Sequence, residues 1–93
     1  DEEIQILEKN ATNGDKNSAF KLYQYHMFVS LDQDLEFKWL EIAAKNGHPI
    51  AQSNLADLFF TQGNKEKAIF WAKKAYINGA KLPDELKILI NIN

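Results

Sequence analysis

The chain has 93 residues, a net charge of −2, 45% hydrophobic and 12% aromatic residues, and no cysteine. This composition suits one small domain with a packed core, and the charge gives no electrostatic support to nucleic-acid binding. The lack of cysteine excludes disulfides, thiolate catalysis and cysteine metal sites, and no apolar run approaches membrane-spanning length.

Residues 1–13 are expected to form a first helix, with Ile4, Leu7 and Ala11 on one side. The acidic residues at its start favour a helix N-terminus through the helix dipole. The chain begins at Asp1 without a methionine, which indicates a fragment or a processed form. The compartment therefore stays open between the bacterial cytoplasm and the periplasm.

The second expected helix covers residues 16–29. Its predicted inner face consists of Ser18, Leu22, Tyr25 and Val29. The helix is unusually apolar on its other sides, where Phe20, Tyr23 and Met27 form a second stripe with Phe28 nearby.

A polar loop at 30–34 follows, in which Asp32 or Asp34 could cap a helix over 35–46. Two further helices are expected over 49–62 and 65–78, separated by a turn around Gly63. The inward positions of the helices at 35–46 and 65–78 are Leu35, Trp39, Ile42, Ala43, Ala68, Trp71, Ala72 and Ala75. The last segment, 83–92, enters a helix at Pro83 and carries one more apolar face.

The same punctuation occurs three times in this order of elements. Asn-Gly pairs at 13–14, 46–47 and 78–79 lie 33 and 32 residues apart, and Trp39 and Trp71 are also 32 apart. Glycine after a helix end takes the left-handed conformation, so this spacing predicts an internal repeat of two helices per unit. We expect a single helical-repeat domain over 1–93, with capping helices at 1–13 and 79–93 and repeats at 14–46 and 47–78.

The repeat resembles the Sel-one-like repeat, a relative of the tetratricopeptide repeat. The matching positions of the second unit are Ala51, Leu55, Phe59, Lys67, Ala68, Trp71, Ala75 and Gly79, and those of the first are Leu22, Trp39, Ala43, Ala44 and Gly47. The first unit departs from the pattern at Tyr23, where the family usually has Gly or Ala, and at Glu36, where it has Ala. The resemblance implies an all-α fold, an α-solenoid of antiparallel helix pairs, and a role in binding other proteins.

Residues suited to chemistry are sparse. His26 and His48 are the two imidazoles; we expect His26 to be packed and His48 to be a solvated turn residue. Their spacing to the carboxylates does not suit a metal site, and no glycine-rich phosphate loop is present. The sequence therefore predicts no enzyme activity, no cofactor and no metal.

The apolar stripe of the second helix is the candidate partner-binding site, because aromatic residues and methionine are enriched in interface cores. Its residues are Phe20, Tyr23, Gln24, Met27 and Phe28. The alternative is that the aromatic residues of this stripe pack within the short array. The acidic groups Asp1–Glu3 and Asp32, Asp34 and Glu36 are expected to be solvated surface, and could also meet a basic partner.

Two functions fit this site. The first is an immunity or inhibitor protein that neutralises a bacterial toxin or secreted effector, since the resemblance includes small bacterial members of this kind. The second is an adaptor or scaffold fragment of a longer Sel-one-like repeat protein. A third reading is a homo-oligomer that uses the same stripe on itself. In each case the expected partner is a protein.

Overall fold

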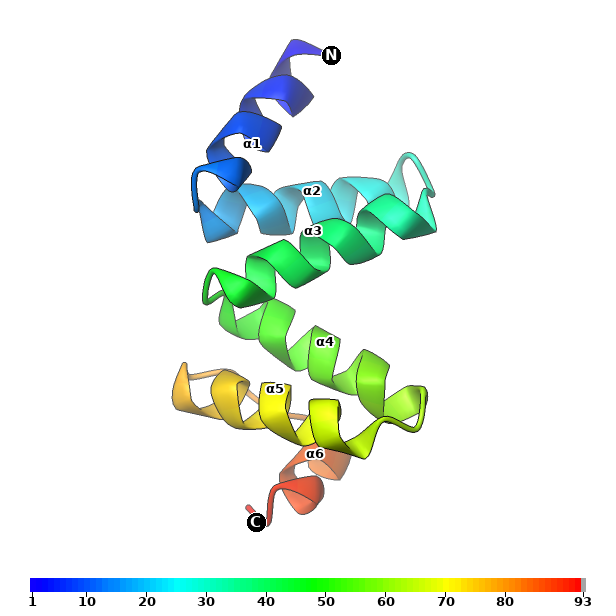
Figure 1. Ribbon diagram of the computed structural model, residues 1–93, viewed down its shortest axis with the longest axis vertical. Coiled ribbons are helices and arrows are strands. Elements are labelled where there is room, and N and C mark those ends of the chain that lie inside the picture. Colours follow the sequence, from blue (N-terminus) through cyan, green and yellow to red (C-terminus); the bar gives the residue numbers. More distant parts are fainter. Residues whose placement is uncertain (93) are drawn as a thin grey trace. The chain divides into compact units, whose positions relative to one another are not determined.

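The computed structural model describes residues 1–92, and over this range the chain forms six α-helices and no strand. The helices are α1 (Glu2–Thr12), α2 (Lys16–Phe28), α3 (Gln33–Lys45), α4 (Pro49–Thr61), α5 (Lys65–Ile77) and α6 (Asp84–Leu89). They pack as sequential antiparallel pairs (Figure 1). The all-α prediction is confirmed, although the last helix ends at Leu89 instead of continuing to residue 92.

Short polar side chains fix where the helices begin. The carboxylates of Asp1, Asp15 and Asp32 accept backbone N–H groups of α1, α2 and α3 at 3.0–3.1 Å. Asn64 does the same for α5, through the N–H of Lys67. Each bond satisfies a donor that the first helical turn leaves without an intrahelical partner. Asp32, and not Asp34, is the cap of α3.

Glycine fixes where α3 ends. Gly47 has φ of +95°, its N–H bonds to the carbonyl of Ala44, and the N–H of His48 bonds to the carbonyl of Ala43, both at 3.0 Å. This double bond is the Schellman arrangement, which requires a left-handed residue after the helix. The same bonding recurs at the other Asn-Gly pairs, so the punctuation in the sequence is explained by helix termination.

The chain divides into two compact units, Asp1–His48 and the residues from Pro49 onward. In the first unit, the buried positions of α2 and α3 include several alanines, which permit close approach of the helix backbones. The residues of this unit that are buried are Ala11, Ser18, Ala19, Leu22, Tyr23, His26, Trp39, Leu40, Ala43 and Ala44.

The inner face of α2 differs from the prediction. Val29 is 65% exposed and Tyr25 is only half-buried, whereas Tyr23 and His26 are buried. The physical reason is that α2 contacts both α1 and α3, so it has two buried faces and no single stripe. Burial of His26 agrees with the prediction of a packed histidine.

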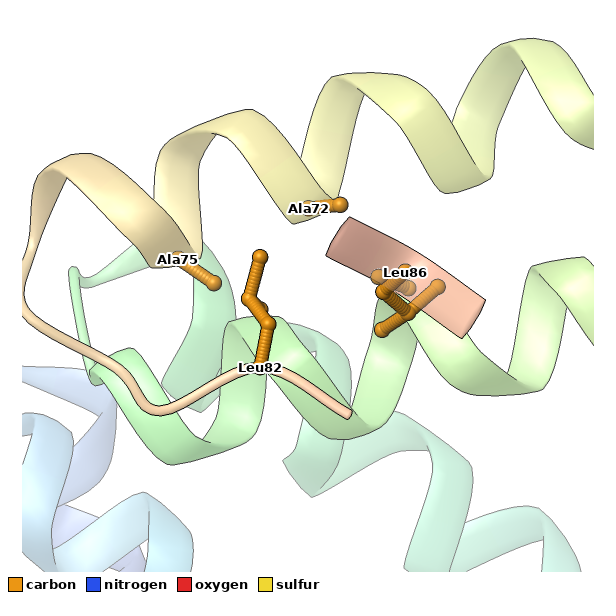
Figure 2. Packing of buried hydrophobic residues seen from close by; sticks show 5 residues of the cluster. Ala72, Ala75, Leu82 and Leu86 are labelled. Atoms are coloured by element: carbon orange, nitrogen blue, oxygen red, sulfur yellow. The ribbon is translucent and has the colours of Figure 1, made fainter. Parts of the chain in front are cut away.

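The second unit has its own core around α5 and α6. Ala56, Ala72, Ala75, Leu82 and Leu86 form a buried cluster, against which Trp71 is partly buried. Figure 2 shows Leu82 and Leu86 directed toward the alanines of α5. The small side chains of α5 leave the space that the leucines fill, so the segment after Gly79 closes this unit.

A polar bond joins the first helix of this unit to the end of the second. The side-chain amide of Asn78 donates to Oε1 of Gln52 at 2.9 Å, and Gln52 is buried. Pairing satisfies a polar group that would otherwise destabilise the core.

Candidate protein-binding surface

The five residues predicted to form one site lie on different sides of α2. Tyr23 is buried and Phe20 and Met27 are half-buried, whereas Gln24 and Phe28 are exposed. The structure therefore gives the exposure that a binding role needs at Gln24 and Phe28, and it places Tyr23 in the core.

Phe20 and Tyr23 belong to an internal aromatic group. The ring of Phe20 stacks on that of His48, with centroids 4.1 Å apart and planes 10° apart, and it tilts against Tyr23 at 5.4 Å. His48 is half-buried, so the prediction of a solvated turn histidine is wrong. Burial lowers the pKa of His48 below its ordinary value, and the positive charge of Lys16 lowers it further.

Gln24 and Phe28 instead line a groove between α1 and α2. Its volume is about 450 Å³ or less, at ≈ 410 Å³. Residues 21, 24, 25 and 28 recur on one face of α2 at helical spacing, opposite the N-terminal half of α1. The lining residues are Asp1, Glu3, Ile4, Leu7, Lys21, Gln24, Tyr25, Phe28 and Val29. We call this feature the α1–α2 groove.

Large apolar side chains lie exposed at the end of this groove. Phe28, Val29 and Leu31 are 71%, 65% and 72% exposed, and they occupy four consecutive positions with Ser30. Phe28 and Val29 also line the groove, so the exposed apolar surface continues into a concave one. We refer to these three residues as the Phe28 cluster.

The loop that carries the cluster is held by hydrogen bonds. Ser30 Oγ lies 2.7 Å from Nδ1 of the buried His26 and accepts the backbone N–H of Asp32 at 3.3 Å. Leu31, between them, has φ of +56°, a left-handed conformation that is unfavourable for a bulky residue. The bonds on either side hold an exposed leucine in a strained backbone, and such strain is often found at functional positions.

Acidic groups surround the groove. Asp1 and Glu3 line it, and Asp32 follows the Phe28 cluster directly in the chain. The first unit contains five lysines and nine carboxylate residues, a net charge of −4, whereas residues 49–93 contain six lysines and four carboxylates, a net charge of +2. The overall charge of −2 therefore conceals an acidic first unit that carries the groove.

The exposed apolar residues of the second unit are arranged differently. Phe70 of α5 is covered on one side by the ammonium of Lys74, 5.0 Å from the ring centroid. Ile77 and Ile88 are exposed on α5 and α6, but neither lines a pocket found in that unit. The pocket of this unit lies instead at Ile50, Ser53, Asn54, Ala80, Lys81, Leu82 and Pro83.

The side chains available for chemistry do not converge. Among residues 1–92, no group of three or more His, Cys, Asp or Glu side chains is arranged to hold a metal ion. Buried polar atoms without a partner in this range are His26 Nε2 and Trp39 Nε1, and neither residue lines the groove. No helix in the described part of the chain is long and apolar enough to cross a membrane.

Sequence reasoning missed part of this surface. Ile4 and Leu7 were expected on an apolar side of the first helix, but their partner across the groove, Val29, was assigned to the core. Leu31 was assigned to a polar loop. The available signal was the run of apolar residues at 27–29 and 31, which extends past the point where Asp32 starts the next helix.

Comparison with known proteins gives one distant relative. The chain is 31% identical over 86 residues to the uncharacterized protein YibG of Escherichia coli strain K12. The matched region covers 85% of this chain and 56% of the relative, so the chain spans about half the length of the curated relative it matches. No protein-family model matches the sequence, and no solved structure matches it.

Proposed function

We propose that this chain is a protein-binding module of the Sel-one-like repeat type, and that it acts without catalysis. The observation that carries the proposal is the continuity of the exposed Phe28 cluster with the α1–α2 groove. Exposed aromatic residues beside a concave apolar surface are typical of interface centres, where a few residues supply most of the binding energy.

The specific role we propose is that of an immunity or inhibitor protein for a bacterial toxin or secreted effector. The small size of the chain and the rigid display of the cluster on a capped helix pair support this role. A preorganised surface loses less conformational entropy on binding, which favours the tight association that an inhibitor needs.

The second candidate is an adaptor or scaffold segment of a longer repeat protein. The length of the relative favours it, because this chain matches only 56% of that protein. An adaptor would bind its partner without changing the partner's activity, and that difference separates the two roles.

The test is capture of the partner from bacterial cells of the source, followed by co-expression. We expect the wild-type chain to restore growth of cells that produce the captured toxin. Phe28→Ser should abolish this protection and weaken binding about tenfold or more, because it removes a central aromatic contact. Ile88→Ser is the matched control, since Ile88 is 70% exposed and lies in the other unit.

The outcomes are distinct. Binding that depends on Phe28, together with an unchanged activity of the partner, supports the adaptor role over the inhibitor role. Equal binding by the Phe28→Ser and Ile88→Ser variants contradicts the proposed surface.

A further inference from the structure

The α1–α2 groove has a chemical character that identifies the kind of partner it fits. Five of its lining residues are apolar or aromatic, and they are Ile4, Leu7, Tyr25, Phe28 and Val29. No buried polar atom without a hydrogen-bond partner is found among the described residues that line it. A small polar ligand would need such groups to orient it, so the groove is better suited to apolar side chains of a polypeptide.

The length of the groove suits a helical segment. Its lining residues on α2 run from Lys21 to Phe28, and at 1.5 Å per residue this stretch is about 10 Å long. Two turns of a docked helix have nearly the same length, and they present apolar residues at i, i+3, i+4 and i+7.

The charge of the surface points to the sign of the partner. The groove rim contains the carboxylates of Asp1 and Glu3 against one ammonium, that of Lys21. The unit that carries it has a net charge of −4. Complementary charge speeds encounter and suppresses partners of like charge.

We propose that the α1–α2 groove binds a basic amphipathic helix, whose apolar side chains contact Phe28 and Val29 and whose lysines or arginines face Asp1 and Glu3. The proposal rests on the proposed function and adds the chemistry of the partner to it.

Two synthetic peptides test this directly. Both are 15-residue helix formers with the same leucine stripe, and their polar positions are lysine in one and glutamate in the other. We expect the lysine peptide to bind the full chain in fluorescence anisotropy at 50 mM salt, and the glutamate peptide to bind at least tenfold more weakly. Amide shifts in an NMR spectrum should change in α1, α2 and the loop through Leu31.

Matched variants separate the apolar and charged contributions. Phe28→Ser should weaken the lysine peptide about tenfold, and Ile88→Ser should leave it unchanged. Glu3→Lys should weaken it about threefold, an effect that fades at 250 mM salt, because exposed charge pairs contribute little and are screened. Glu66→Lys is the control, since Glu66 also lies in the first turn of a helix but in the second unit.

The proposal is overturned if both peptides bind equally, if the shifts map to α5 or α6, or if Glu66→Lys has the same effect as Glu3→Lys. Self-association of the chain through the Phe28 cluster would also overturn it. A natural partner that depends on Phe28 but not on Glu3 or on salt would leave the proposed function intact and refute only the basic partner.

Discussion

Leu31 shows how one residue can serve the surface at the expense of the fold. Its φ of +56° is a conformation that costs an L-residue about 1–2 kcal/mol, and its side chain is 72% exposed. No burial offsets this cost, so a contribution to stability does not explain why leucine stands here.

Replacing Leu31 with glycine should therefore leave the protein at least as stable. Relief of the left-handed strain exceeds the added chain entropy of glycine, about 0.5–1 kcal/mol, so the free energy of unfolding should rise by about 0.5 kcal/mol. Chemical denaturation measures it. Val29→Gly is the matched control, because Val29 is equally exposed at an ordinary φ of −110°, and it should lose stability. Equal losses in the two variants would show that Leu31 is not strained.

His48 makes the stability of the protein depend on pH. Its pKa is lowered by burial against Phe20, so the unfolded chain takes up a proton more readily than the folded one. The free energy of unfolding should then fall as the pH drops below the ordinary histidine pKa of about 6.5 and continue to fall down to the folded pKa.

The His48→Phe variant isolates this effect, because it keeps the stacked ring and removes the titration. Between pH 7.5 and 5.0 it should lose less stability than the wild type, as followed by urea unfolding at the two pH values. A wild-type His48 that titrates at or above 6.5 by NMR would argue against this account.

The helices themselves were largely predictable from the sequence, because their ends are set by local chemistry. Asparagine-glycine pairs mark Schellman ends, and Asp32 marks an N-terminus, without any information about tertiary packing. The faces of α2 were not predictable, because a helix with apolar residues on several sides gives no single stripe. Only the packing of α1 and α3 decided that Tyr23 is buried and Phe28 exposed.

The short helix α6 closes the second unit through Leu86. This side chain is fully buried against Ala72 and Ala75 (Figure 2). Leu86→Ala should lower the free energy of unfolding by about 2–5 kcal/mol, because it leaves a cavity between α5 and α6.

Ile88→Ala on the same helix should change the free energy of unfolding by less than about 0.5 kcal/mol, since Ile88 is largely exposed. Thermal melts of both variants compare the two positions under the same conditions. Similar melting temperatures would mean that α6 is not packed on the unit as described.

At the scale of the whole molecule, the repeat and the surface have different origins. Both units use the same helix-ending and capping chemistry, which accounts for the regular spacing of the sequence. The groove depends on what is not repeated: the acidic start of α1 and the apolar residues that end α2. Net charge over the full chain could not reveal this asymmetry, because the second unit is basic.

The most direct test of a partner-binding surface on the first unit is hydrogen–deuterium exchange of the chain with and without its captured partner. Binding at the α1–α2 groove predicts slower exchange in peptides covering α1, α2 and the loop through Leu31, with α5 and α6 unchanged. Protection confined to α5 and α6, with the peptides of α1 and α2 exchanging as in the free protein, would contradict the account.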